Sequence, residues 1–478
     1  MEVADARGHL KSTKKEMNPL SRKPTRKIDL ALDRLFGPKG YFVPQWPGDF
    51  KRKDFLSREV RLTDDRMILL TDEGLESFRA IVGILHDEDL FDGHAAYSDI
   101  WSACQDVHRD LLSKSHRPDD ADEFVALATK IVNGRISEHT FVVPLLGIEL
   151  KDVDEIVIGS LRVVRPTLEL LTKMEVSASG NHAAKFVEHT KFMLWLTGTV
   201  RGTTPVAVRK FREKAQLATG LISIVAGSLY EHGAHGFRIG IAMSPEEAYG
   251  RGQYLHWRED DKSLVTTHQF SRAQRLTVDP EMRARIEAST LGKRATSIVE
   301  STSRTEIEEA IVKAIHWYSD AHRDEVIVMR FLKYWSCVEV FFSSSSKKIT
   351  AAVSIGLAAI LSHGYVEFAR PEEYNKLRKR IVGLYKQRSK ATHRAAFDHV
   401  TERDAADLSQ WVSWLILNSL IFVENGMSST SQMKAWTQAV HRRNRPEWSW
   451  LRALPERARR CQSALKNYFH RMRAKGPL

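Results

Sequence analysis

The sequence predicts an α+β protein: an N-terminal mixed α/β domain followed by an all-α helical bundle. Up to about residue 290, runs of β-branched residues alternate with helical segments. Beyond residue 300, apolar residues recur at the three- and four-residue spacing of helices, and no convincing strand pattern appears. With 478 residues, of which 42% are hydrophobic, the chain is long enough for about three globular domains.

The N-terminal region combines both kinds of element. Acidic residues open the first of three expected helices, and Thr204 and Pro205 are a favourable N-cap and first residue for a longer fourth helix. The order strand, helix, strand around this fourth helix predicts a small domain that ends near residue 290. The expected helices cover residues 71–85, 95–112, 121–134 and 205–230, and the expected strands cover residues 140–150, 155–164, 191–200 and 237–243.

Five helices are expected in the C-terminal half, at residues 301–321, 322–342, 349–362, 371–387 and 402–425. We therefore divide the chain into four parts. These are a basic tail expected to be disordered (1–45), a mixed α/β sensor or recognition domain (46–290), a helical domain (301–430) and a basic helical extension (431–478).

The net charge of +12 is concentrated at the two ends. Residues 1–27 carry +5 and residues 441–478 carry +9, which leaves −2 for the chain between them. Such basic arms suit a polyanion such as RNA, because each phosphate contact releases counterions. They are equally typical of solubilising tails that bind no partner.

Cysteine usage and hydropathy indicate a cytoplasmic protein without a membrane partner. The three cysteines are far apart, which excludes a zinc ribbon or a disulfide framework and fits a reducing compartment. The N-terminus lacks the apolar core of a signal peptide. The longest apolar run, Ile349–Leu361, is shorter than the roughly 20 residues that span a bilayer.

The segment LYKQRSKATHR (384–394) places Arg388 five residues before His393. The same spacing occurs at Arg251/His256 and Arg394/His399, so spacing alone does not identify a site. Arg388 differs because it continues an apolar helical stripe formed by Tyr374, Leu377, Ile381 and Leu384/Tyr385. An inward-facing arginine is costly to bury without a partner, so we expect an anion beside it.

On a continuous helix, five residues correspond to about 140° of rotation, so Arg388 and His393 would not face the same point. Three arrangements would still bring them together: the long arginine stem, a helix break near Ser389–Thr392, or two copies of the domain that combine their pairs across a symmetric interface.

The residues Leu384, Tyr385, Arg388, Ser389 and His393 follow, in order, the motif of the Apea-like branch of HEPN domains. The preceding segment MRFLKYWSCVEVFF, with Arg330, Trp335 and Glu339, is similar to that family's aromatic- and Glu-containing helix. Residues 301–430 therefore resemble a HEPN domain. Arg394 departs from the pattern, since many members have a small residue at that position.

The resemblance implies a metal-independent endoribonuclease that needs no cofactor and acts as a homodimer. The RNA 2′-hydroxyl would attack the phosphate, with His393 as acid–base and Arg388 holding the phosphate. Glu339 is our candidate to orient Arg388, although an exposed or locally paired acid explains it as well. As RNA contacts we expect Lys386, Lys390, Arg394 and Tyr385.

Proteins of this type often serve as toxins or antiviral defence effectors, and the resemblance implies such a role here. The N-terminal domain would then bind a trigger molecule. Two other functions stay open from the sequence: a HEPN-like dimer that holds RNA or a nucleotide without cutting it, and a scaffold in which the helical domain only dimerises.

Overall fold

The computed structural model describes residues 20–43, 58–63, 66–167, 169–170, 181–191, 193–229, 237–242, 252–257, 264–269, 275–288, 290–301, 303–324, 326–343, 349–394 and 399–444. The fold is α+β with a helical C-terminal region, so the predicted fold class is confirmed. The chain divides into two compact units. One contains residues 1–139 and 200–210, and the other contains residues 140–199 and 211–478. The five-stranded sheet thus belongs to the same unit as the helices beyond residue 300, which corrects the expectation that residues 46–290 form one domain.

Four helices and a small sheet share one hydrophobic core in the first unit. The sheet has the order β1-β3-β2 with antiparallel neighbours. Thr71 caps α3 by accepting a hydrogen bond from the Gly74 backbone amide at 3.0 Å, and the acidic residues Asp72 and Glu73 open the helix as expected. The helices are α1 (Arg22–Leu35), α3 (Asp72–Asp87), α4 (Tyr97–Ser113) and α5 (Ala121–Arg135), and the strands are β1 (Tyr41–Phe42), β2 (Glu59–Arg61) and β3 (Met67–Leu70).

Helix α1 corrects the prediction that residues 1–45 are disordered. Ile28, Leu32 and Leu35 are each at most 3% exposed and belong to the core of this unit. Their four- and three-residue spacing places them on one helix face. The polar and basic residues between them masked this apolar stripe in the sequence. Residues 1–19 lie outside the described part of the chain.

The second unit contains a five-stranded sheet of order β6-β7-β8-β4-β9. Residues 155–164, which were expected to form one strand, form two strands, β6 and β7, that pair as an antiparallel hairpin. Strand β5 instead pairs in parallel with β12, far along the chain, and β10 and β11 form a separate hairpin. The strands are β4 (Ser137–Leu146), β5 (Ile148–Leu150), β6 (Glu155–Ile158), β7 (Leu161–Val164), β8 (Leu194–Gly202), β9 (Gly240–Ile241), β10 (Gly252–Trp257), β11 (Leu264–Gln269) and β12 (Leu276–Val278), with helix α7 at Asn181–Thr190.

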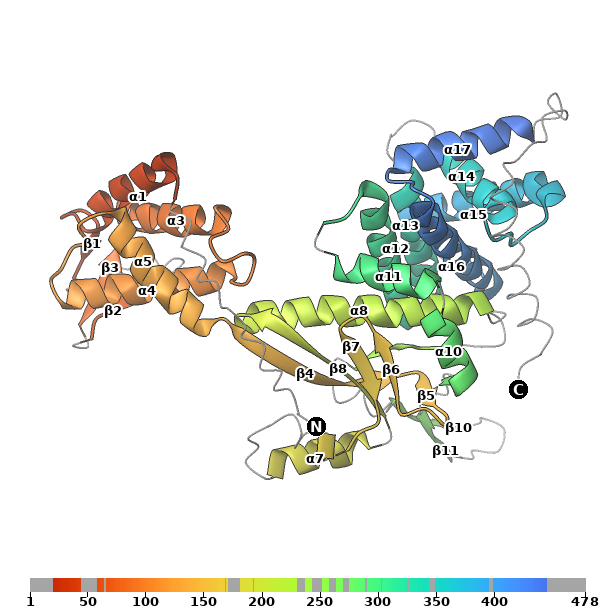
Figure 1. Cartoon of the computed structure of the whole chain (residues 1–478), viewed down its shortest axis with the longest axis horizontal. Coiled ribbons are helices and arrows are strands. Elements are labelled where there is room, and N and C mark those ends of the chain that lie inside the picture. The colour runs from red at the N-terminus through yellow and green to blue at the C-terminus, as the bar shows by residue number, and fades with distance from the viewer. Residues whose placement is uncertain are drawn as a thin grey trace, which may run out of the picture. The chain divides into compact units, whose positions relative to one another are not determined.

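The long helix α8 (Thr204–Leu229) connects this sheet to the helical bundle. In Figure 1 it lies between the strands and the helices drawn in green and blue. On one side Phe211 stacks on Phe141, with ring centroids 4.5 Å apart. On the other side, a Cβ added at Gly220 would lie 2.7 Å from Ile315, and one at Gly227 would collide with the Tyr318 hydroxyl. The glycines therefore allow the close approach that joins the sheet and the bundle in one unit.

The bundle surrounds the largest hydrophobic core of the described chain. Its helices are α10 (Pro280–Ala288), α11 (Thr290–Glu300), α12 (Glu306–Arg323), α13 (Ile327–Phe342), α14 (Ile349–His363), α15 (Tyr374–Arg394), α16 (Glu402–Glu424) and α17 (Thr430–Arg443), with a short 3₁₀ turn at Pro371–Glu373 before α15. Helix α16 is long and apolar enough to cross a membrane by length and composition, but 83% of its apolar window is buried in the protein. That burial is typical of a core helix. Of the predicted C-terminal extension, the structure describes α17 and Asn444 only.

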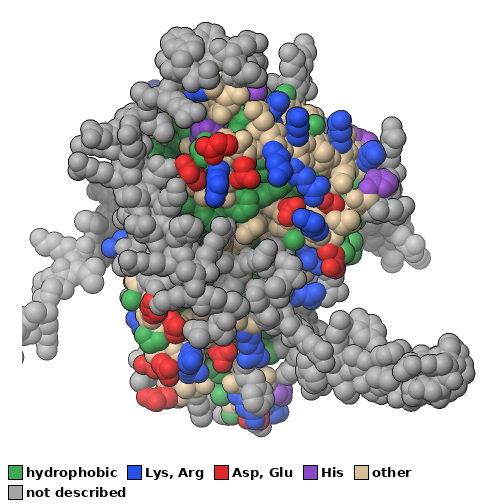
Figure 2. All heavy atoms as spheres, turned by 90° about the vertical axis from the view of Figure 1, so that its right-hand side faces the viewer, with side chains coloured by type: hydrophobic (Ala, Val, Ile, Leu, Met, Phe, Trp, Pro, Cys, Tyr) green, Lys and Arg blue, Asp and Glu red, His purple; other side chains and the backbone are tan. Residues whose placement is uncertain are grey.

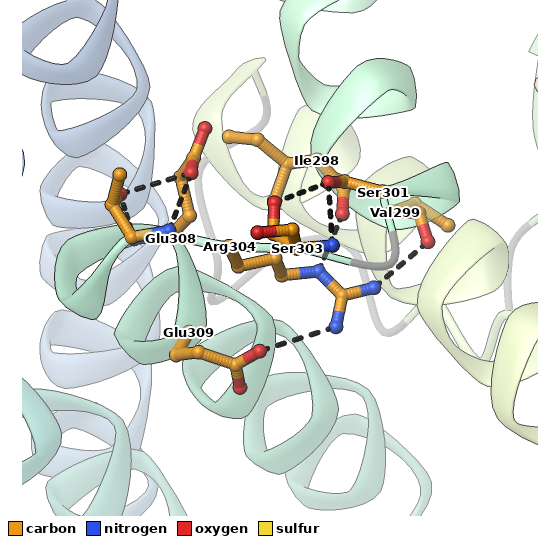
Figure 3. A network of polar contacts seen from close by, with 8 residues as sticks. Ile298, Val299, Ser301, Ser303, Arg304, Glu308 and Glu309 are labelled. Carbon is orange, nitrogen blue, oxygen red and sulfur yellow. Dashed lines mark hydrogen bonds and ion pairs between the residues drawn. The ribbon is translucent and has the colours of Figure 1, made fainter.

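Figure 3 shows how the turn between α11 and α12 is fixed. Arg304 donates hydrogen bonds to the carbonyl oxygens of Ile298 (2.7 Å) and Val299 (3.0 Å), which are left without helical partners at the end of α11. It also forms an ion pair with Glu309 at 3.3 Å. Thr305 and Glu308 then form a capping box at the start of α12. This junction sets the direction of α12, on which α13 packs.

Candidate functional site

Helix α15 carries Arg388 and His393, and its apolar stripe is buried as predicted. Tyr374, Ile381 and Leu384 are at most 1% exposed and belong to the core of the bundle. Arg388 continues this stripe, and its side chain is 24% exposed. The position of Arg388 therefore follows from the same three- and four-residue periodicity that packs α15 onto the bundle.

Glu339 of α13 is the anion beside Arg388. Its Oε2 accepts a hydrogen bond from an Arg388 guanidinium nitrogen at 3.0 Å, and its Oε1 accepts one from the Tyr385 hydroxyl at 3.0 Å. The Glu339 side chain is 19% exposed. One carboxylate thus binds two side chains that lie three residues apart on α15, which fixes how α13 and α15 are aligned. The expected contact between Glu339 and Arg388 is present.

The aromatic rings of Tyr385 and Trp335 pack beside this ion pair. Their rings meet edge to face with centroids 5.2 Å apart, and the guanidinium carbon of Arg388 lies 5.7 Å from the centre of the Tyr385 ring. Burial, followed by the negative charge of Glu339 and the hydrogen bond to it, raises the pKa of Tyr385 to about 12. The tyrosine therefore remains a neutral donor to Glu339 at physiological pH.

The burial of Tyr385 corrects its assignment as an RNA contact. The residue is 7% exposed, and its ring packs on Trp335 while its hydroxyl binds Glu339. No free ring face remains on which a base could stack. The sequence placed Tyr385 on the apolar stripe, but only the position of α13 shows that the ring is covered.

His393 lies on a different side of α15 from Arg388. The helix continues without interruption to Arg394, and Thr392 donates a hydrogen bond back to the Arg388 carbonyl at 3.0 Å. The helix break that we allowed near Ser389–Thr392 is therefore absent. His393 is exposed, about 140° around the helix and about 7.5 Å along it from Arg388. One chain alone does not bring the imidazole and the guanidinium to the same point.

Lys386 and Lys390, two of the expected RNA contacts, are exposed on α15. Arg394 belongs to α15, but its side chain lies outside the described part of the structure. Lys376 and Lys379 lie on the same exposed face, and the sequence analysis missed them. The intervals of three, seven and four residues between Lys376, Lys379, Lys386 and Lys390, which are whole helical turns, were the available signal.

Of the two other Arg/His pairs, the structure describes the side chain of His399 alone. The side chains of Arg251 and His256 lie outside the described residues. His399 is exposed and follows the end of α15, so it does not continue the helix that carries Arg394. Arg388, whose side chain the structure does describe, combines an inward helix position with a carboxylate partner.

A second polar cluster lies where α14, α15 and α17 meet. The Tyr374 hydroxyl is 2.9 Å from Nδ1 of His441, and the side-chain nitrogen of Asn444 is 3.1 Å from Nε2 of His363. Burial, and secondarily the charge of Arg443, lowers the pKa of His363, while Glu372 acts in the opposite direction. These contacts satisfy buried polar groups and fix the end of α17.

Within the described residues, no group of three or more His, Cys, Asp or Glu side chains is arranged to hold a metal ion. Comparisons with protein-family models, with curated proteins and with solved structures found no match to this chain. The resemblance of residues 301–430 to HEPN domains therefore rests on the motif residues themselves.

Proposed function

We propose that this protein is a metal-independent endoribonuclease that cleaves RNA by attack of the RNA 2′-hydroxyl on the adjacent phosphate. The observation that supports it is the arrangement of Glu339, Tyr385 and Arg388, which fixes a guanidinium at the edge of the bundle on the helix that exposes His393. The products would carry 2′,3′-cyclic phosphate and 5′-hydroxyl ends.

Each residue type suits its proposed role. Arginine keeps its charge and binds phosphate oxygens through a planar fork, so Arg388 would neutralise the charge that develops on the phosphate. An imidazole exchanges protons near neutral pH, which contributes about 10²- to 10⁴-fold to such reactions. Glu339 would be a positioning residue, because it touches Arg388 and Tyr385 and not the RNA.

The separation of Arg388 and His393 on α15 favours a site made by two copies of the chain. In a symmetric dimer, Arg388 of one copy can lie beside His393 of the other, and the symmetry makes two such sites. The proposal therefore includes a homodimer. We also propose that the protein acts as a cytoplasmic toxin or antiviral defence effector, whose trigger molecule is bound by the part of the chain that precedes the helical bundle.

The test is RNA cleavage in the presence of a chelator by wild type, His393→Ala, Arg388→Ala and His399→Ala. His399 is the matched control, because it is an exposed histidine beyond the end of α15. We expect loss of at least about 100-fold for the first two variants and none for the control. Equal cutting by all four proteins, or no cutting by wild type, contradicts the proposal.

Mixing the two inactive variants tests the shared site directly. In a re-equilibrated equimolar mixture, half of the dimers are mixed and each holds one intact Arg388/His393 pair, so about a quarter of wild-type activity should return. If each chain contained a complete site, mixing would restore nothing.

The second candidate is a dimer that binds RNA or a nucleotide without cutting it. The ion pair with Glu339 favours it, since this contact already compensates the charge of Arg388 within the chain. If wild type binds RNA and the RNA remains uncut, this function is favoured.

A further inference from the structure

One face of α15 carries a row of lysines that the Arg/His pair does not explain. Lys376, Lys379, Lys386 and Lys390 are all exposed, and Gly383 lies between the two halves of the row. The intervals of three, four, three and four residues keep these positions on one side of the helix. At 1.5 Å per residue, the row is about 21 Å long from Lys376 to Lys390, and His393 continues it by one turn.

The lysines of this row form no direct ion pairs within the described chain. Helix α15 contains eight lysines and arginines and no acidic residue. Two of the arginines form ion pairs: Arg380 with Asp404 at 2.6 Å, and Arg388 with Glu339 at 3.0 Å. The four lysines make no hydrogen bond or ion pair with any residue that the structure describes. Figure 2, which views the molecule from the right-hand side of Figure 1, shows many Lys and Arg side chains on the upper part, with Asp and Glu side chains beside some of them.

Gly383 is the second, independent feature of this face. It is exposed in the interior of α15, and a Cβ added there would meet no atom within 4 Å. Glycine inside a helix costs about 0.5–1 kcal/mol relative to alanine, and no packing contact here requires it. Its effect is to leave bare backbone in the middle of the lysine row, where an extended ligand can lie directly against the helix.

The arrangement of this face favours single-stranded RNA over a membrane surface or duplex RNA. Binding of a helix to a membrane surface needs an apolar face beside the basic one, and the apolar residues of α15 are buried in the bundle. Duplex RNA is contacted across a groove on two strands, whereas a single straight row of charges follows one strand. A row of about 21 Å fits roughly four nucleotides, the lower end of the range for single-strand-binding modules.

We infer that the face formed by Lys376, Lys379, Gly383, Lys386 and Lys390 binds the sugar–phosphate backbone of single-stranded RNA and leads it to His393. This inference rests on the proposed function, because it names the substrate class of that nuclease. The lysines supply sequence-independent affinity, and Gly383 allows close approach of the strand.

The test uses binding of the full-length protein to a single-stranded 2′-O-methyl oligonucleotide, which lacks the nucleophile and cannot be cut. Four phosphate contacts give a slope of log affinity against log salt of about −2.8. Replacing all four lysines by glutamine should remove this slope and weaken binding at least about 100-fold at low salt. The control is Lys130→Gln with Lys313→Gln, two exposed lysines on α5 and α12, and it should bind as wild type does.

Gly383→Ala provides a variant that cannot fail by unfolding. It and the control Gly83→Ala, in α3, each add a methyl group to a helix interior with free space around it. Both should raise the midpoint of urea unfolding, whereas only Gly383→Ala should weaken RNA binding, by about fivefold.

Unchanged binding by the quadruple variant overturns the inference, and so does duplex RNA that binds as tightly as single-stranded RNA. Equal competition by polyglutamate or by anionic phospholipid vesicles also overturns it. Because the oligonucleotide cannot be cut, lysine-dependent binding supports the inference even if wild type cleaves no RNA. Cleavage that survives the lysine replacements overturns it and leaves the proposed nuclease intact.

Discussion

The ion pair between Glu339 and Arg388 should stabilise the bundle by an amount that a double-mutant cycle can measure. The variants are Glu339→Ala, Arg388→Met and both together. The two side chains are 19% and 24% exposed, and their N···O distance is 3.0 Å. Exposed pairs contribute about 0.2–1 kcal/mol, whereas loss of one partner of a fully buried pair costs about 3–5 kcal/mol. For this partly buried pair we expect a coupling free energy of roughly 1–2 kcal/mol.

Glu339→Ala alone should cost more than the coupling, because the Tyr385 hydroxyl also loses its acceptor. The assay is urea unfolding followed by tryptophan fluorescence, since Trp335 contacts Tyr385 and reports on this part of the bundle. The control cycle uses Asp110 and Lys114, an i,i+4 pair with side chains 54% and 66% exposed, for which about 0.3–0.5 kcal/mol is expected. A Glu339–Arg388 coupling no larger than this control would refute the assignment of a structurally important ion pair.

Three further predictions concern stability. Burial lowers the pKa of His108 to about 3, so the unfolded chain binds an extra proton between pH 6.5 and 3. The free energy of unfolding is therefore unaffected by His108 well above pH 6.5, and it decreases by about 2 kcal/mol when the pH is lowered to 5. Urea unfolding should show that His108→Leu removes this decrease. Gly227→Ala should destabilise the bundle by about 1–3 kcal/mol in the same assay, because the new methyl group collides with the Tyr318 hydroxyl. An unchanged midpoint of unfolding would contradict this prediction, because it would mean that α8 and α12 can move apart at no cost. Thr305→Ala should cost about 1 kcal/mol by loss of the α12 capping box, and Thr305→Ser should restore most of it.

The helices were predictable wherever their caps and apolar periodicity are local. The acidic first turn of α3 and the apolar stripe of α15 identify their helices from a few neighbouring residues, and the structure confirms both helices. Helix α1 carries the same local signal, because Ile28, Ala31, Leu32 and Leu35 lie at helical spacing and are buried, but the basic and polar residues around them suggested a disordered tail. Strand β9 lies within the strand expected at residues 237–243, whereas the three-residue strand β12 is defined by its pairing with β5, far along the chain, which no local pattern records.

For the candidate site, the sequence alone determined that Arg388 faces inward, because its phase on α15 is set by the residues immediately before it. The five-residue spacing also determined that Arg388 and His393 face different directions on a continuous helix. Only the tertiary structure decided that Glu339 meets Arg388 and that Tyr385 is covered, because both depend on how α13 packs on α15. Periodicity and capping act within one or two helical turns, whereas a side-chain contact between residues 49 apart requires the whole bundle to fold.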